Sequence, residues 1–268
     1  MLADEVAKVS SGKYKDFSMN EEERYELYIA SWLHDCGKVA TPPHVVDKGT
    51  KLETIFDRIE LIKTRMEILK RDAEIDFLKR QINGLLPEFD KTYHDSIKNI
   101  DDNIKFIESS NIGGEFMKPE LQDKILSISK NKVVLNNIEQ NILTDNEVNN
   151  LNIAKGTLLP EERDIINDHI SITIDMLEQL PYPKNLKNIP EFAGGHHEKM
   201  DGTGYPKGLK GDQMSTQAKV MAIADIYEAL TAADRPYKEG KKLSQAMRIM
   251  GFMKNDYHID EDLSLIHI

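Results

Sequence analysis

Apolar residues recur at helical spacing along almost the whole chain, and this periodicity constrains the fold more than any other feature. In the segment after residue 54 they step by four and three along one seam: Ile55, Ile59, Ile62, Met66, Leu69 and Ala73. Such steps place side chains on one face of an α-helix. No long stretch alternates apolar and polar residues with period two, so the sequence predicts an all-α fold.

Breaker residues divide this pattern into segments. Asn83-Gly84 and Pro87 interrupt the first seam, and a second apolar stripe follows up to Ile107, which together predict an antiparallel helical hairpin. Residues 129–150 are rich in Asn and are expected to form an irregular return segment. Further helices are expected after Pro160, over residues 215–232 and over residues 244–254. The helix after Pro160 is expected to turn one face inward: Ile165, Ile166, His169, Ile172, Met176 and Leu177.

Composition excludes several classes of protein. The chain has 46 acidic against 35 basic residues and a formal net charge of -11, so a nucleic-acid polymer is a poor partner. Its single cysteine, Cys36, cannot form an internal disulfide, which favours a cytoplasmic location. The sequence contains no apolar run of the length that a membrane-spanning helix needs. Whether a full-length parent is anchored to a membrane is left open.

Histidines and carboxylates occur at positions that ordinary packing explains poorly. His34-Asp35 ends an apolar helical run, and His169 lies within an apolar stripe, where a hydrogen-bonded core histidine is the alternative. His196-His197 follows two glycines in a loop. Asp225 interrupts the apolar segment 220–226, and a buried carboxylate must be paired or bind a metal.

Together these residues supply four imidazoles and two carboxylates: His34, Asp35, His169, His196, His197 and Asp225. This mixture suits iron, manganese or a similar first-row ion better than a thiolate zinc site or an all-oxygen calcium site. The set exceeds what one ion needs, so it predicts a metal cluster. Two-metal centres activate water for phosphoester hydrolysis, and that reaction is therefore expected.

At these residues the chain resembles the HD-GYP family. Residues 34–38 (His-Asp-Cys-Gly-Lys) are similar to its first motif, and residues 196–206, which end in Gly204-Tyr205-Pro206, are similar to its extended signature. Residues 225–230 and 234–238 resemble the next block, and residues 159–162 with His169 resemble the segment of the middle histidine. The resemblance covers about residues 22–54 and 151–262.

The resemblance implies an HD-domain helical bundle with two or three divalent ions, Fe or Mn, that linearises cyclic di-GMP to pGpG and can cut it further to GMP. The six residues above match metal ligands, with Asp35 as the expected bridge. Lys38 matches a lysine that steadies or protonates the reacting phosphate. Arg235 and Lys238 match residues that grip substrate phosphates, and the alternative is a solvated helix end. Gly204, Tyr205 and Pro206 would shape a substrate-binding loop.

We expect a discontinuous catalytic domain over residues 1–54 and 151–268, truncated at both ends, with a helical insertion over residues 55–150. The insertion could form a homodimer contact or a lever from N-terminal sensory domains, or it could pack only on its own domain. Two other functions stay open. One is a module that binds the nucleotide or a partner protein without turnover. The other is a phosphohydrolase for a different cyclic dinucleotide or a nucleoside phosphate.

Overall fold

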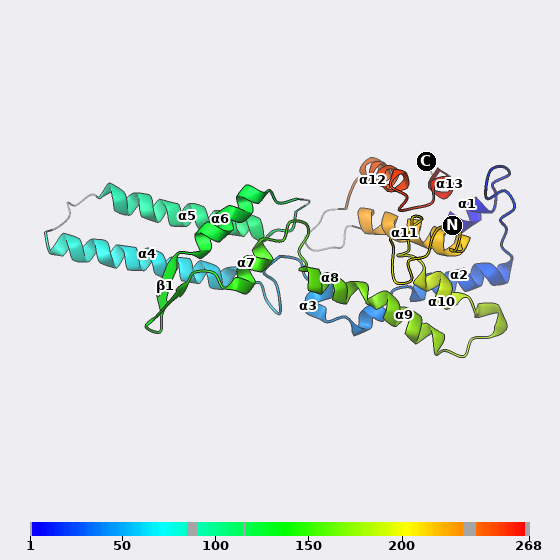
Figure 1. The fold of residues 1–268 in the computed structure, drawn as a ribbon, viewed down its shortest axis with the longest axis horizontal. Helices are drawn as coiled ribbons and strands as arrows, with labels where there is room; N and C mark the ends of the chain where they lie inside the picture. Colours follow the sequence, from blue (N-terminus) through cyan, green and yellow to red (C-terminus); the bar gives the residue numbers. More distant parts are fainter. Residues whose placement is uncertain (1, 85–89, 115, 233–239, 266–268) are drawn as a thin grey trace. The chain divides into compact units, whose positions relative to one another are not determined.

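The computed structural model describes residues 2–84, 90–114, 116–232 and 240–265 (Figure 1). They form a mostly helical fold, which confirms the predicted class. They divide into two compact units, one of residues 1–42 and 164–268 and one of residues 43–163. The domain boundaries at 54/55 and 150/151 stay a prediction. Within the described ranges, no helix has both the length and the hydrophobicity that crossing a bilayer requires.

The first unit is a helical bundle that contains the candidate ligands. Its elements are α1 (Leu2–Val6), α2 (Glu21–Leu33), the 3-10 helix η1 (Cys36–Ala40), α9 (His169–Glu178), the 3-10 helix η2 (Lys184–Leu186), α10 (Ile189–Gly194), α11 (Thr216–Thr231), α12 (Leu243–Asn255) and α13 (Glu261–Leu265). α8 (Pro160–Asn167) begins in the second unit and ends in the first.

Local sequence explains where the two central helices of this unit begin. Asn20 accepts a hydrogen bond from the amide of Glu23, whose carboxylate accepts from the amide of Asn20, so a capping box starts α2. Ser215 caps α11 by accepting from the amide of Ala218. α10 packs against α2, α9 and α11.

Two apolar clusters hold this bundle together. One lies where α1, α11, α12 and α13 meet and includes Val6, Val220, Met250 and Leu263. The other joins α2, α9, α10 and α11. Because α11 contributes to both clusters, its position is fixed from two sides.

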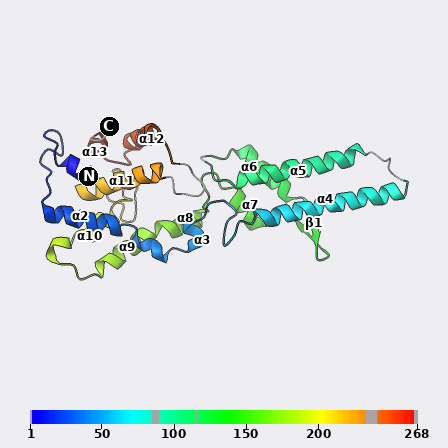
Figure 2. The ribbon, with the colours of Figure 1, turned by 180° about the vertical axis from the view of Figure 1, so that it is seen from behind.

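The second unit contains the predicted helical hairpin. Its elements are α3 (Pro43–Val46), α4 (Ile59–Ile82), α5 (Lys91–Asn111), α6 (Pro119–Ser129), β1 (Lys132–Leu135), β2 (Ile138–Asn141) and α7 (Asp145–Leu151). α4 and α5 lie side by side and antiparallel in both views (Figures 1 and 2). Ile62 and Met66 of the predicted seam are buried, whereas Ile55 precedes α4 and is 94% exposed, so its place in the seam was wrong.

The expectation of an irregular segment over residues 129–150 was also wrong. β1 and β2 form an antiparallel pair in which Leu135 lies opposite Ile138. The two residues between the strands, Asn136 and Asn137, both have positive φ angles, of 52° and 62°. Asn tolerates this backbone conformation, and two such residues in succession are typical of a tight hairpin turn.

The predicted apolar stripe after Pro160 was also wrong in part. The structure ends α8 at Asn167 and begins α9 at His169, with Asp168 between them. Ile165 is 43% exposed and Met176 is 40% exposed, contrary to expectation, whereas His169 and Leu177 are buried. The inward face of α9 consists of His169, Ile170, Thr173, Ile174 and Leu177.

Candidate metal centre

The six predicted ligands come from four places in the first unit. His34 and Asp35 follow the last residue of α2, and His169 begins α9. His196 and His197 follow the end of α10, and Asp225 lies in the second half of α11. The structure brings all six side chains into one cluster. That they bind metal stays a prediction, which the geometry below supports.

Three of the histidines are oriented in the same way. The Nδ1 atoms of His34, His169 and His196 contact the backbone carbonyl oxygens of Ser31, Ile166 and Ala193, in each case three residues earlier. A carbonyl oxygen only accepts hydrogen bonds, so each Nδ1 must carry the proton. In a neutral ring this leaves a lone pair on Nε2, which is the form of histidine that binds metals.

These Nε2 atoms converge on the carboxylate of Asp35. Oδ1 of Asp35 lies 3.1 Å from Nε2 of His169 and 4.0 Å from Nε2 of His196, while Oδ2 lies 3.4 Å from Nε2 of His34. Nε2 of His34 also lies 3.7 Å from Oδ1 of Asp225. Lone pairs of nitrogen and oxygen repel each other, so these approaches require a proton or a cation between the atoms. Asp35 has the central position expected of a bridging ligand.

The donors fall into two groups that share one histidine. His169, His196 and His197 form one group, and His34, Asp35 and His196 form the other, with candidate ligand atoms in each group within 4.8 Å of one another. Nε2 of His196 is buried and has no hydrogen-bond partner among the described residues. An orphaned buried nitrogen is costly unless a ligand satisfies it. The residues present therefore fit a metal centre.

Burial keeps two of the histidines neutral. It lowers the pKa of His196 to about 4 and, with the neighbouring His196 ring adding to the effect, the pKa of His197 to about 3. Both rings are thus uncharged at neutral pH, each with one ring nitrogen free of a proton, and protons compete weakly for that lone pair. The rings of His196 and His197 lie 4.3 Å apart between centroids, and His169 packs edge-on against His197.

The two carboxylates are ionised despite partial burial. Burial alone would raise the pKa of Asp35, but hydrogen bonds with His169 and Lys38 hold it well below its usual range. Burial likewise acts to raise the pKa of Asp225, yet the contact with His34 and the nearby histidines lower it overall. The apolar neighbours of Asp225 in the sequence suggested a fully buried side chain, but the side chain is 27% exposed. Its Oδ1 faces His34, whereas Lys219 pairs with Asp260.

Packing of η1 against α9 positions Asp35. A Cβ atom on Gly37 would lie 2.1 Å from the carbonyl oxygen of His169, so only glycine fits at this contact. The amide of Gly37 donates to Oγ1 of Thr173 over 2.9 Å. Sequence reasoning missed Thr173, although it follows His169 by four residues and therefore shares its helix face. Lys38, the predicted catalytic lysine, places Nζ 2.6 Å from Oδ2 of Asp35.

The predicted substrate loop, Gly204-Tyr205-Pro206, lies against His197. The hydroxyl of Tyr205 is 3.0 Å from Nδ1 of His197, and the two rings stack with centroids 4.8 Å apart. Gly204 approaches the backbone of Glu198 too closely for any side chain. Pro206 follows Tyr205 through a cis peptide bond. The predicted phosphate-gripping residues, Arg235 and Lys238, lie outside the described residues.

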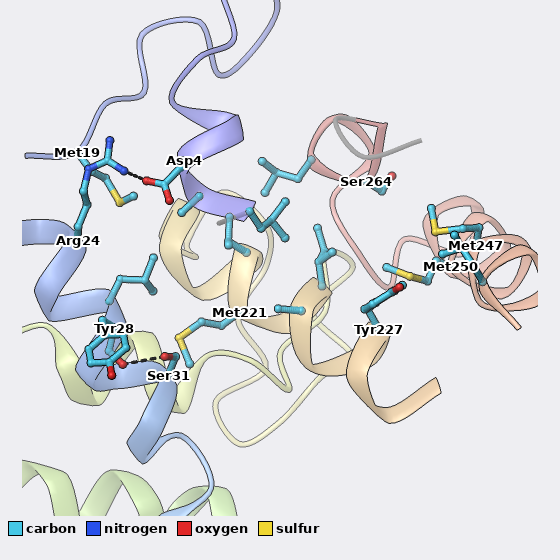
Figure 3. Close-up of a pocket in the computed structure, with 18 residues that line it drawn as sticks. Asp4, Met19, Arg24, Tyr28, Ser31, Met221, Tyr227, Met247, Met250 and Ser264 are labelled. Carbon is cyan, nitrogen blue, oxygen red and sulfur yellow. Dashed lines mark hydrogen bonds and ion pairs between the residues drawn. The ribbon is translucent and has the colours of Figure 1, made fainter. Parts of the chain in front are cut away.

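A separate cavity of about 830 Å³ lies in the same unit between α1, α2, α11, α12 and α13 (Figure 3). It is lined mainly by apolar side chains, with an ion pair between Asp4 and Arg24 at one edge. None of the six candidate ligands is among the described residues that line it. It adjoins the centre through Ser31, whose carbonyl oxygen contacts Nδ1 of His34.

Comparison with known proteins matches part of this chain to a family model. Residues 143–263 match the model of an HD domain. The match includes His169, His196, His197 and Asp225 but begins after His34 and Asp35. The structure joins that earlier doublet to the matched region.

Relatives of this chain are cyclic-dinucleotide enzymes by name. The chain is 38% identical to 3'3'-cGAMP-specific phosphodiesterase 3 of Vibrio cholerae over 95 residues. This aligned stretch covers 35% of this chain and 20% of that protein. It is 39% identical to a cyclic di-GMP phosphodiesterase of Thermotoga maritima over 96 residues, and the aligned stretch covers 36% of this chain and 26% of that protein. A probable cyclic di-GMP phosphodiesterase of Vibrio cholerae is 39% identical to the chain over 106 residues, and the aligned stretch covers 38% of this chain and 24% of that protein.

The matched stretches thus span about a quarter or less of the length of these curated relatives. They agree with the family match and with the motifs at residues 34–38 and 196–206. The chain therefore carries an HD domain, and its motifs and relatives are consistent with the HD-GYP family.

Proposed function

We propose that this chain is a metal-dependent phosphodiesterase module that hydrolyses cyclic di-GMP to linear pGpG, which it can cut further to GMP, as an output of bacterial second-messenger signalling. One observation carries the proposal: two overlapping groups of candidate ligands share His196, and Asp35 of one group also contacts His169 of the other. This arrangement supports two adjacent ions, which is the centre that phosphoester hydrolysis uses. The names of the relatives support cyclic dinucleotides as the substrate class.

The residues of the chain would hold two or three ions, Fe or Mn, through His34, Asp35, His169, His196, His197 and Asp225. When bound, such ions lower the pKa of water and neutralise charge on the phosphoryl oxygens. Nitrogen and carboxylate donors without thiolates suit these metals. Because the rings of His196 and His197 are uncharged at neutral pH, each keeps one lone pair available.

Lys38 would place a positive charge beside the reacting phosphate. Its amine is bound to Oδ2 of Asp35, and its side chain remains 41% exposed, so it can face both the centre and a bound substrate. A cation fixed next to developing negative charge stabilises the transition state more than the ground state. Arg235 and Lys238 would bind substrate phosphates, and the forked guanidinium of Arg235 suits two oxygens at once.

A second substrate, 3'3'-cGAMP, is favoured by a specific observation, because three of the relatives are named for it. The test is to load the protein with Mn²⁺ without oxygen and to measure kcat/KM separately for cyclic di-GMP and 3'3'-cGAMP. We expect linear product from both and a higher kcat/KM for cyclic di-GMP. A preference for 3'3'-cGAMP would reassign the substrate, and binding of either nucleotide without product would favour a receptor.

A matched control makes the same Asp→Asn substitution at a candidate site residue and at an exposed residue. Asp35→Asn removes the central carboxylate charge, whereas Asp175→Asn makes the same change on the exposed face of α9. The proposal predicts loss of turnover in the first variant and wild-type turnover in the second. Equal activity of both variants would contradict a catalytic centre at Asp35.

A further inference from the structure

His197 differs from the other three histidines in what holds its ring. The Nδ1 atoms of His34, His169 and His196 contact backbone carbonyl oxygens, which only accept hydrogen bonds. Nδ1 of His197 instead lies 3.0 Å from the hydroxyl of Tyr205. A hydroxyl can donate or accept, so this contact alone leaves the tautomer of His197 undetermined.

The other atoms around His197 decide between the two possibilities. If the hydroxyl donated to Nδ1, a neutral ring would carry its proton on Nε2 and could not bind metal through that atom. If Nδ1–H donates to the hydroxyl, the lone pair on Nε2 is available, as in the other three histidines. His197 belongs to a group of candidate ligands with His169 and His196. The second arrangement is the one that completes the group.

Glu198 holds Tyr205 in the required place. Its side chain is buried, with the residue only 2% exposed, and its two carboxylate oxygens accept hydrogen bonds from the amides of Lys207 and Leu209 over 2.7 and 2.8 Å. A buried carboxylate is stable only with such partners. These amides follow Tyr205 by two and four residues, so the carboxylate fixes the loop directly after the tyrosine.

Two further contacts bring this loop onto the histidine. The amide of Tyr205 donates to the carbonyl oxygen of His197 over 3.2 Å. Gly204 lies so near the backbone that an added Cβ would be 2.5 Å from Cα of Glu198. The loop, the histidine and Glu198 are thus packed together, and the ring of Tyr205 has little freedom to move away from His197.

We propose that Tyr205 and Glu198 are positioning residues for the metal ligand His197. The hydroxyl of Tyr205 accepts the Nδ1–H of His197 and so directs Nε2 to the metal, while Glu198 anchors the loop that carries Tyr205. This assigns to Tyr205 a role other than substrate contact. The inference rests on the metal centre of the proposed function, and it concerns metal binding in the absence of any nucleotide.

The direct test is the protonation of the ring. Protein with ¹⁵N-labelled histidine is loaded with Zn²⁺, which is diamagnetic, and the ring nitrogens are assigned by long-range ¹H–¹⁵N correlation. We expect His197 to carry its proton on Nδ1 and to bind metal through Nε2. A proton on Nε2, or ligation through Nδ1, would overturn the inference without any need for a variant.

The second test measures metal affinity by competition with a chelating dye. Tyr205→Phe keeps the stacked ring and removes only the hydroxyl, and loss of such an orienting partner lowers metal affinity about 10–100-fold. Glu198→Gln should produce a loss of similar size, and the double variant should lose less than the product of the two. Tyr25→Phe, at an exposed position on α2, and Glu178→Gln, at an exposed position on α9, are the matched controls.

The alternative roles give different results. If Tyr205 only contacts substrate, Tyr205→Phe would raise KM and leave the affinity for Zn²⁺ unchanged, which would overturn the inference. Wild-type protein that binds no Zn²⁺ would overturn the centre and this inference together. Metal-loaded protein that hydrolyses no cyclic dinucleotide, yet shows the expected tautomer, would count against the proposed function and support the positioning role.

Discussion

Replacing Gly37 with alanine should damage both the fold and the centre. The added Cβ would lie 2.1 Å from the carbonyl oxygen of His169 and 2.7 Å from the amide nitrogen of Thr173. Both are backbone atoms that cannot rotate away, so η1 and α9 must separate by roughly 1 Å. Asp35, two residues earlier, would then move away from the histidine that begins α9.

The size of the effect follows from these contacts. Overpacking at a tight backbone contact costs about 1–3 kcal/mol, and loss of the hydrogen bond from the Gly37 amide to Thr173 adds about 1 kcal/mol. We therefore expect Gly37→Ala to lower the free energy of unfolding by about 2–4 kcal/mol. Because a ligand is displaced, metal affinity should fall at least about tenfold.

A matched glycine should respond in the opposite direction. Gly251 lies inside α12, and nothing within 4 Å would contact an added Cβ. Gly251→Ala should raise the free energy of unfolding by about 0.5–1 kcal/mol, because alanine is the better helix former. Urea unfolding followed by circular dichroism would compare both variants. If Gly37→Ala matched wild type in stability and metal affinity, the packing argument for Asp35 would be refuted.

Three further substitutions test other parts of the account. Asp35→Ala should abolish metal loading and turnover together, and a variant that retained both, by metal analysis and product chromatography, would remove Asp35 from the centre. Arg235→Ala should mainly raise KM, and a change confined to kcat would contradict its role in binding phosphate. Asp260→Asn should lower the free energy of unfolding by about 3–5 kcal/mol, because the almost fully buried carboxylate binds Tyr14, Lys13 and two backbone amides. Burial acts to raise the pKa of Asp260, but these partners lower it overall, so its stabilisation is present above the unfolded pKa of about 3.9 and is lost as pH falls through the lower native pKa. In unfolding experiments from pH 2 to 7, the free energy of unfolding of the variant should lack the loss at low pH that Asp260 causes. A pH profile of stability identical to that of wild type would contradict this role of Asp260.

Sequence periodicity was sufficient for the helices but not for the short hairpin. The apolar stripes predicted α4 and α5 because each helix buries one face against a neighbour, and the strongly apolar segment 215–232 predicted α11, which packs against two clusters. β1 and β2 are four residues each, too short for an alternating pattern to be clear. The signal that could have located them is Asn136-Asn137, two residues that tolerate positive φ between apolar segments.

The candidate ligands could be named from the sequence, but the orientation of their rings could not. Buried positions of imidazoles and carboxylates are visible as interruptions of apolar patterns, as with His169 and Asp225. Which ring nitrogen faces the centre depends on the carbonyl or hydroxyl that contacts the other nitrogen, and that is a property of the folded backbone. For the same reason, the roles of Thr173 and Glu198 emerged only from the structure.

Several predictions concern features beyond the described structure. The homodimer through residues 55–150, the N-terminal sensory domains and the cytoplasmic location stay predictions. Exposed apolar residues on α4, such as Leu61, Ile75 and Ile82, are a reason to measure the mass of the protein in solution. A monomer at all concentrations would contradict the homodimer.

The central claim is that the four histidines and two carboxylates form a metal centre that hydrolyses a cyclic dinucleotide. Its most direct test is to purify the protein without oxygen, count the metals per chain, and follow cyclic di-GMP and its linear product in the same sample. The account predicts two or three Fe or Mn ions per chain together with linear pGpG. Protein that holds no metal after reconstitution and forms no product would contradict it.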